Sequence, residues 1–237
     1  MEQTTLEETT ATERTVTITV ATYNIWHAGN GIDEIAGVIR RSNADIIGIQ
    51  EVDYLNTRSS GQDQPKLIAE AAGYDYYEFI PAIDYKGGKY GTAILSKYPI
   101  ESFEYVKLDS GEREGRAIGH ASINIDGKIL DFYTTHLSYE EKNLRTGQFE
   151  QIAAMLAGCE NYVLTADFNT QDFSEFDVLG ASVMVNRTGS VHVTFPKSSS
   201  AIDNILASAS FTEKKTSTIT SDASDHYLLY TVLEFEK

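Results

Sequence analysis

The sequence is poor in several residue types, and each shortage excludes a class of protein. One cysteine among 237 residues, Cys159, leaves no internal disulfide and no thiolate zinc site. Because this thiol follows an apolar helical pattern, a buried structural role is favoured over a nucleophilic one. The chain has four prolines and no low-complexity linker. No apolar run approaches the roughly 20 residues that a membrane-spanning helix requires.

Basic residues are also scarce. The chain has 19 Lys and Arg against 35 Asp and Glu, which gives a formal net charge of −16. Such a surface repels phosphate backbones, so a protein that binds nucleic acid by general electrostatic attraction is disfavoured. The same excess supplies carboxylates for a divalent cation, which would reverse the field locally.

The first residues are mostly Thr, Glu and Gln. They lack the basic and apolar regions of a signal peptide. A cytoplasmic protein and a secreted protein whose signal peptide is absent from this chain are both open alternatives. We expect residues 1–13 to form a disordered or weakly ordered acidic tail, and residues 14–237 to form one soluble, monomeric domain.

Apolar spacing predicts a β-α-β opening. Alternating apolar residues predict a strand over 16–25, and a helical apolar face follows over 32–39. The run 45–50 is almost entirely apolar, as in a strand that is covered on both faces. A second helix is predicted after Pro65, ending at Gly73.

The rest of the chain is richer in predicted strands. Asp126-Gly127 predicts a tight hairpin, and the apolar spacing over 140–156 predicts a helix. The other predicted strands are 92–96, 100–108, 117–125, 129–137, 162–166, 182–185, 192–195, 202–207, 216–220 and 227–235. Two strand-rich halves that each carry helices predict an α/β protein with two packed sheets and helices outside them.

Polar residues gather at the ends of the predicted strands. They are Asn24, Glu51, His136, Asp167, Asn169, Asp203, Asp225 and His226. Functional sites are commonly built at such ends, because the loops vary while the sheet holds them. Carboxylate and amide oxygens without thiolates suit Mg²⁺, with Mn²⁺ as an alternative, and a histidine beside a carboxylate supplies a proton acceptor. This combination is typical of metal-assisted hydrolysis of a phosphate ester.

Seven short segments, taken in their order, resemble the endonuclease/exonuclease/phosphatase family over residues 16–235. They are ATYNI (21–25), IQEVD (49–53), YGTAILS (90–96), TTHL (134–137), TADFN (165–169), AIDNIL (201–206) and SDHY (224–227). The family includes deoxyribonucleases, apurinic endonucleases, inositol-polyphosphate 5-phosphatases and sphingomyelinases, and this chain is most similar to its short bacterial members. The resemblance implies a four-layer α/β/β/α sandwich of two packed mixed sheets with helices on the outer faces.

The resemblance also implies roles for the matching residues. Asn24, Glu51 and Asp225 would surround the divalent metal. Asp167 would orient or activate the attacking water, and Asn169 would help to hold the phosphoryl group.

Two histidines complete the implied catalytic set. His226 would act as general base or stabilise the transition state, with Asp203 fixing its ring. His136 would lie across the phosphate, as a hydrogen-bond donor or as the acid that assists the leaving group. Arg58 and Arg116 are candidates for gripping substrate oxygens, and solvated or ion-paired arginines are the alternative for both.

Some positions depart from the family's pattern or flank it. Thr92 stands where Asn is frequent, and Asn204 stands where Tyr or His is frequent, which bears on substrate fit. Trp26, Tyr85 and Tyr90 are candidates for an aromatic rim, or for ordinary partly buried aromatics.

The sequence therefore predicts a Mg²⁺-dependent hydrolase of phosphate esters. A phosphodiester of a small molecule or lipid is favoured as substrate because the chain is acidic. A nuclease that acts on DNA or RNA is one alternative, and a catalytically silent binding module on the same fold is another.

Overall fold

The computed structural model describes residues 15–236, so the tail predicted over 1–13 lies outside the described residues. The strands are β1 (Thr15–Asn24), β2 (Ile46–Tyr54), β3 (Tyr76–Tyr85), β4 (Gly88–Ser96), β5 (Ile100–Leu108), β6 (Arg116–Ile125), β7 (Lys128–His136), β8 (Tyr162–Asp167), β9 (Val183–Met184), β10 (Asp203–Ala207), β11 (Phe211–Ile219) and β12 (Leu228–Glu236). The helices are α1 (Ile32–Ser42), α2 (Gln64–Ala72) and α3 (Lys142–Leu156), with 3₁₀ turns η1 (Trp26–Ala28) and η2 (Phe173–Leu179). None of these helices is long and apolar enough to cross a membrane.

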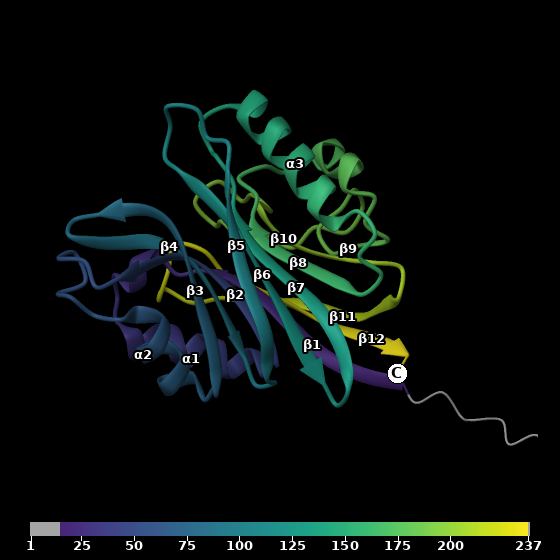
Figure 1. Ribbon diagram of the computed structural model, residues 1–237, viewed down its shortest axis with the longest axis horizontal. Coiled ribbons are helices and arrows are strands. Elements are labelled where there is room, and N and C mark those ends of the chain that lie inside the picture. Colours follow the sequence, from purple (N-terminus) through teal and green to yellow (C-terminus); the bar gives the residue numbers. More distant parts are fainter. Residues whose placement is uncertain (1–14, 237) are drawn as a thin grey trace, which may run out of the picture.

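The strands form two six-stranded sheets that pack face to face, with helices on both outer sides (Figure 1). The first sheet has the order β11-β12-β1-β2-β4-β3, and the second has the order β5-β6-β7-β8-β10-β9. Each sheet carries one parallel pair near its centre, β1 with β2 and β7 with β8, while the other pairs are antiparallel. The predicted four-layer sandwich of mixed sheets is confirmed.

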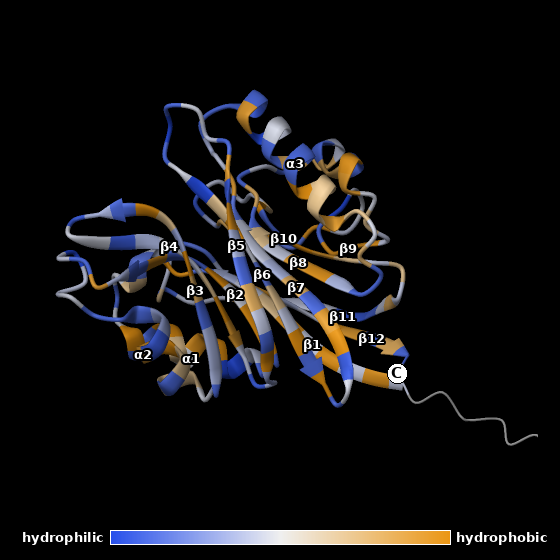
Figure 2. Cartoon of the chain, viewed as in Figure 1, coloured by the Kyte–Doolittle hydropathy of each residue, from blue (hydrophilic) through white to orange (hydrophobic). Residues whose placement is uncertain are grey.

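Three apolar clusters separate the four layers. One lies between the sheets and includes Ile46, whereas its neighbours Ile47 and Ile49 belong to the cluster under α1 and α2. A third cluster packs α3 and η2 on the second sheet. Because β2 is covered on both faces, successive side chains alternate between two cores, and each buried isoleucine contributes about 1.5–3 kcal/mol. The helices carry both apolar and polar stretches, as helices with one covered face do (Figure 2).

The hairpin predicted at Asp126-Gly127 joins β6 to β7. Both residues have positive φ, +50° and +94°, and Ile125 pairs directly with Lys128. Two consecutive left-handed residues match the twist of the flanking strands, which is why Asp-Gly is favoured there.

Three features differ from the sequence-based expectations. Strand β3 was not predicted, since its residues are mostly half-exposed and show no clean alternation. The segment 192–195 is not a strand, because only Phe195 forms a bridge, to Ser200 in a tight turn. Glu51 does not follow β2 but lies inside it, at a bulge between Gln50 and Val52.

A buried polar layer joins the two sheets beneath the site residues. The Gln50 amide donates hydrogen bonds to the hydroxyls of Thr22 (3.1 Å) and Thr134 (3.3 Å), and the Thr165 hydroxyl donates to that of Thr134 (3.1 Å). Gly48 allows the sheets to approach here, because a Cβ at this position would lie 2.2 Å from Thr134 Oγ1. Internal hydrogen bonds of this kind fix how one sheet lies on the other.

Candidate active site

One edge of the sandwich collects the polar side chains that the sequence singled out. Asn24 ends β1, and His136 and Asp167 end the parallel strands β7 and β8, where they are paired in register. Asp203 begins β10 opposite Asp167, because these strands are antiparallel. His226 lies just before β12. The strand directions therefore bring residues from both sheets together.

Asn24 links the two sheets at this edge. Its buried amide nitrogen donates to Glu51 Oε1 and to Asp167 Oδ2, both at 3.0 Å. Its backbone oxygen accepts a hydrogen bond of 2.7 Å from the Ser224 hydroxyl, which holds the segment with Asp225 beside β1. Asn24 thus positions three of the predicted site residues.

Glu51 is aimed into the site by an unusual backbone. Its φ is +60°, which non-glycine residues seldom adopt, and it is the bulged residue of β2. Burial raises the pKa of Glu51, the Asn24 hydrogen bond and His226 lower it, and Asp225 raises it. No Lys or Arg among residues 15–236 forms an ion pair with this carboxylate. A bulge that re-aims one side chain is a common device at active sites.

Asp203, His226 and Asp167 form a buried relay. His226 Nδ1 lies 2.9 Å from Asp203 Oδ2, and its Nε2 lies 3.7 Å from Asp167 Oδ2. Burial lowers the pKa of His226, but the carboxylates of Asp203, Asp167 and Asp225 outweigh burial and raise it to about 10. His226 is therefore an imidazolium at neutral pH in the metal-free protein.

Asp167 is a buried carboxyl with polar neighbours at both of its oxygens. Its Oδ1 accepts from the Asn169 backbone at 2.9 Å, while Oδ2 faces Asn24, His226 and His136. Burial and the charge of Asp203 raise the pKa of Asp167, and His226 and the hydrogen bonds oppose them. The result is a carboxyl whose pKa lies well above its usual range, which suits an acceptor of a proton near neutral pH.

His136 is held neutral beside Arg116. Burial lowers the pKa of His136 well below its ordinary value, and the charges of Arg116 and His226 lower it further. Asn169, at φ +53°, directs its amide nitrogen to His136 Nε2 and to the backbone oxygen of Leu137, both at 2.9 Å. A neutral His136 suits a hydrogen-bonding role better than that of the acid.

The two predicted substrate-binding arginines differ in their surroundings. Arg116 is buried, donates from Nη1 to Glu114 at 2.6 Å, and lies 3.5 Å from His136 Nδ1, with its Nε lacking a hydrogen-bond partner. Arg58 instead forms a bidentate pair with the fully buried Asp53, at 2.8 and 2.6 Å. Its guanidinium lies over Tyr85, 4.6 Å from the ring centroid. Arg116 thus lies beside His136, whereas the contacts of Arg58 are those of an ion-paired arginine.

Asp225 has a partner that sequence reasoning missed. Its Oδ2 lies 3.1 Å from Nζ of Lys197. Lys197 lies in the turn that joins Phe195 to Ser200. Phe195 packs on the His226 ring, with centroids 4.9 Å apart. A single lysine in a loop carries no periodicity or motif, so only the fold reveals this contact.

The residues at this edge fit a hard divalent cation. Asn24, Glu51, Asp225 and Asp167 offer amide and carboxylate oxygens, and Glu51 is a mostly buried carboxylate without a cationic partner among the described side chains. Ligand atoms of Asp167, Asp203 and His226 also lie within 4.8 Å of one another, although His226 Nδ1 is already hydrogen-bonded to Asp203. Mg²⁺ and Mn²⁺ prefer oxygen ligands, and a carboxylate without a Lys or Arg partner supplies the negative charge that such an ion requires.

The two departures from the family's pattern are both buried. Asn204 pairs with Asn186, donating to its backbone oxygen and accepting from its backbone nitrogen, both at 2.8 Å. Thr92 lies beside Arg116 and His136, and its hydroxyl has no hydrogen-bond partner. Asn204 therefore supports a loop, while Thr92 borders the site.

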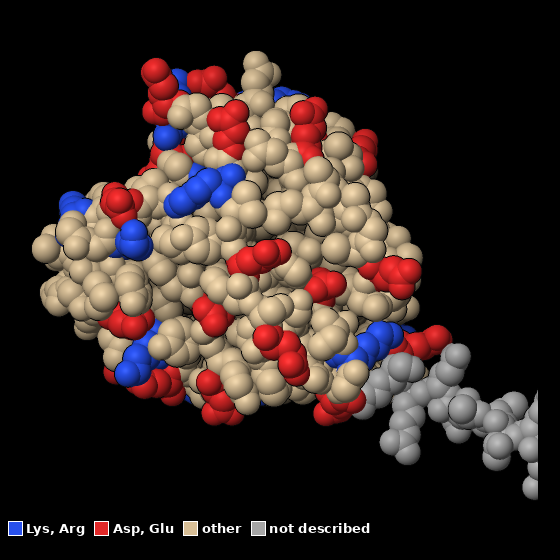
Figure 3. Space-filling view, viewed as in Figure 1, with Lys and Arg blue, Asp and Glu red and all other residues tan. Residues whose placement is uncertain are grey.

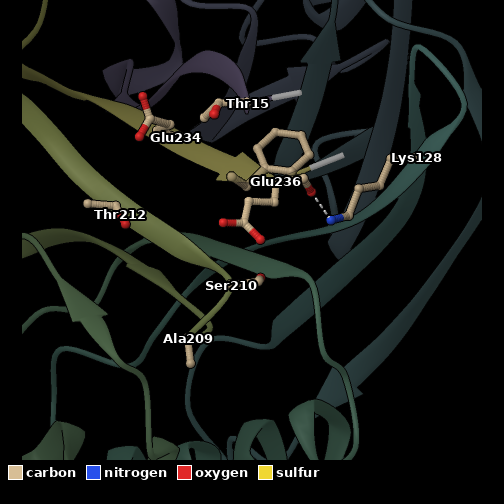
Figure 4. Close-up of a pocket in the computed structure, with 8 residues that line it drawn as sticks. Thr15, Lys128, Ala209, Ser210, Thr212, Glu234 and Glu236 are labelled. Carbon is tan, nitrogen blue, oxygen red and sulfur yellow. Dashed lines mark hydrogen bonds between the residues drawn. The ribbon is translucent and has the colours of Figure 1, made fainter. Parts of the chain in front are cut away.

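A separate hollow of about 350 Å³ lies at the opposite end of β1 (Figure 4). It is lined by Thr15, Lys128, Ala209, Ser210, Thr212, Glu234, Phe235 and Glu236, with Lys128 hydrogen-bonded to the backbone of Glu236. It shares no residue with the polar set at the Asn24 end.

Comparison with known proteins agrees with this geometry. A model of the Endonuclease/Exonuclease/phosphatase family matches residues 21–226, which contain every predicted site residue. The chain belongs to this family. Members of the family are phosphoester hydrolases, and divalent-metal dependence is general among them.

Individual relatives are distant. The chain is 26% identical over 155 residues to an uncharacterized protein, YbhP, of Escherichia coli, and the match covers 58% of each chain. It thus spans about three fifths of that relative. The crystal structure of an endonuclease/exonuclease/phosphatase from Beutenbergia cavernae matches with TM-score 0.81 and 20% identity, covering 92% of this chain and 72% of that one. A mannosyl-6-phosphatase of Bacteroides thetaiotaomicron matches with TM-score 0.69 and 20% identity, covering 91% and 99%. These structures show the shared fold.

Proposed function

We propose that this member of the family is a Mg²⁺-dependent hydrolase that cleaves a phosphodiester of a small molecule or lipid. The observation that carries the proposal is the buried Asp203–His226–Asp167 relay. It lies beside Asn24 and Glu51, whose side-chain oxygens are candidate metal ligands. These residues place three groups next to one another. They are a carboxyl that can accept a proton, a cationic imidazole and a candidate cation site. That set matches the requirements of water attack on phosphorus.

The reaction uses each of these groups in a defined way. Water adds to phosphorus and its proton passes to Asp167, while the bond between phosphorus and the leaving oxygen breaks and that oxygen takes up a proton from solvent. The imidazolium of His226, fixed by Asp203, offsets charge that develops on the phosphoryl oxygens. A divalent cation held by Asn24, Glu51 and Asp225 would offset the remaining charge.

Arg116 and the residues around it complete the proposed phosphate site. The buried guanidinium has a free Nε, and neutral His136 lies within 3.5 Å of its Nη1. Asn169 is held by its backbone contact to Asp167 and by its amide contact to His136. The guanidinium suits phosphoryl oxygens, because it binds them with directional hydrogen bonds, and Asn169 holds His136 in place beside it.

The charge of the chain supports a small substrate. With a net charge of −16, the protein repels long polyanions. On the face seen in Figure 3, acidic side chains are scattered widely and basic ones form no continuous stripe. Nucleic acid needs such a stripe along its backbone, whereas a single phosphate ester needs only the local cations.

A paired substrate panel tests this proposal. Bis(p-nitrophenyl) phosphate and p-nitrophenyl phosphate are supplied with Mg²⁺ or with EDTA, and supercoiled plasmid is supplied in parallel. We expect Mg²⁺-dependent release of nitrophenol, faster from the diester. Equal rates with Mg²⁺ and EDTA would reject metal dependence. Faster release from the monoester, or nicking of plasmid at comparable enzyme concentration, would reassign the substrate.

A further inference from the structure

Lys197 occupies the outer side of the candidate cation site. Its ammonium lies 3.1 Å from Asp225 Oδ2, and its side chain is 65% exposed. Two aromatic rings flank it, Phe195 at 5.7 Å and Trp26 at 6.0 Å from ring centroid to Nζ. The ammonium therefore sits between a carboxylate and two aromatic faces, a place that suits a cation.

The elements that carry this cluster are firmly anchored. The turn with Lys197 is closed by backbone hydrogen bonds between Phe195 and Ser200 (2.9 and 3.1 Å), and the Tyr227 nitrogen donates to the Thr194 oxygen at 2.6 Å. The last bond ties the base of the turn to the segment that bears Asp225.

Trp26 is anchored as well, in a rare conformation. Trp26, His27 and Ala28 all have positive φ, from +45° to +51°. The Trp26 nitrogen donates to Asn24 Oδ1 at 3.1 Å, and Gln64 donates to the His27 oxygen at 2.8 Å. Strain of this kind persists only where surrounding contacts enforce it, and it holds the indole, 41% exposed, at the mouth of the site.

We propose that Lys197 is an internal counter-cation of the site: it holds Asp225 in the metal-free protein and gives up this carboxylate when a divalent cation binds. The inference rests on the proposed function, because it requires Asp225 to face the cation. One carboxylate cannot serve the ammonium and a divalent ion at full strength, so binding of the ion is an exchange of cations. The released ammonium remains exposed between Trp26 and Phe195, where it meets the negative charge of an incoming substrate.

Metal affinity tests the exchange without any substrate. Free Mn²⁺ is measured by its electron paramagnetic resonance signal as the protein is titrated, with Mg²⁺ as competitor. Removing a competing cation in Lys197→Gln should tighten Mn²⁺ binding roughly two- to five-fold, the range that an exposed ion pair provides. Lys197→Arg keeps the charge and should bind Mn²⁺ within about two-fold of the wild type.

Lys214→Gln is the matched control. Lys214 pairs with Glu234 at 2.5 Å. Glu234 lies near the C-terminal end of β12, whereas His226 precedes the first residue of this strand. This variant should leave the Mn²⁺ affinity unchanged. Lys197→Gln with wild-type or weaker affinity would overturn the inference.

The single tryptophan gives an independent readout. In the wild type, Mg²⁺ should change the emission of Trp26 because the ion pair between Lys197 and Asp225 beside its ring is broken, and in Lys197→Gln that change should be largely lost. A full emission change in the variant would contradict the exchange. Hydrolysis by the same wild-type sample separates the cation exchange from the proposed hydrolase function. If hydrolysis depends on Mg²⁺ but the Lys197 variants bind Mn²⁺ as the wild type does, only the exchange is rejected. A wild type that neither binds Mn²⁺ nor hydrolyses the ester removes both.

Discussion

Replacing Asp203 by Asn removes one of the three carboxylates that keep His226 protonated. The bond between Asp203 Oδ2 and His226 Nδ1 is 2.9 Å long, and both side chains are buried. A hydrogen bond to a charged partner contributes about 1.5–3 kcal/mol. Since one pKa unit corresponds to about 1.36 kcal/mol, Asp203→Asn should lower the pKa of His226 by about one to two pH units.

The same change has a pH-dependent effect on stability. The pKa of His226 is raised in the folded protein to about 10, from an ordinary value of 6.5. Its contribution to stability is therefore fully present below pH 6.5 and is lost as the pH rises through about 10. Asp203→Asn should lower the free energy of unfolding by about 1.5–3 kcal/mol near neutral pH, and by less in strong base.

The assay is a pH titration of the histidine rings by long-range ¹H–¹⁵N NMR in EDTA. The chain has five histidines, and the spectrum of His226→Gln identifies the relevant signal. Asp131→Asn is the matched control, because Asp131 Oδ1 lies 2.8 Å from Nε2 of a different histidine, His120. The reasoning is refuted if His226 titrates near its ordinary pKa in the wild type, or if Asp203→Asn and Asp131→Asn leave its pKa equally unchanged.

Three further substitutions separate structural from functional roles. Arg58→Met should lower the free energy of unfolding by about 1–3 kcal/mol and leave kcat intact, because buried Asp53 loses its bidentate partner; urea unfolding and steady-state kinetics distinguish these effects. Arg116→Met should lower kcat/KM about 10- to 100-fold, since a charge-assisted bond to the phosphate is lost, with unfolding in urea little changed. Gly48→Ala should destabilise the fold by about 1–3 kcal/mol, because the added Cβ would lie 2.2 Å from Thr134 Oγ1; an unchanged urea midpoint would contradict this.

Much of the sandwich follows from local pattern. β2 could be predicted because both of its faces are covered, which leaves an uninterrupted apolar run, and the hairpin at Asp126-Gly127 was predicted from the backbone preference of that dipeptide. β3 escaped prediction because it is an edge strand with half-exposed side chains, and Pro81 lies at its bulge. An edge strand is specified by its neighbour more than by its own periodicity.

The candidate site could be predicted as a set of residues but not as a network. The sequence singled out all of these residues, and the resemblance implied the contact between Asp203 and His226, but the contact between Asn24 and Asp167 is revealed only by the packing of the two sheets. The amino-acid sequence alone also does not reveal that Glu51 occupies a β-bulge. These contacts depend on the packing of the two sheets, which short-range pattern does not encode.

The roles of charged partners were the hardest to predict. Arg58 was a candidate for substrate, but its bidentate contacts go to Asp53, five residues away. Lys197 was not singled out at all, and its contact with Asp225 spans 28 residues. Ion pairs depend on where long flexible side chains end, so they follow from tertiary structure alone.

The most direct test of the central claim compares kcat/KM for bis(p-nitrophenyl) phosphate between the wild type and Asp167→Asn, both with saturating Mg²⁺. Glu150→Gln, which removes an exposed carboxyl from α3, is the control for loss of negative charge. Loss of the proton acceptor should lower kcat/KM by about 10²–10⁴-fold in Asp167→Asn, with Glu150→Gln equal to the wild type. Equal rates in all three proteins would show that hydrolysis does not use this site.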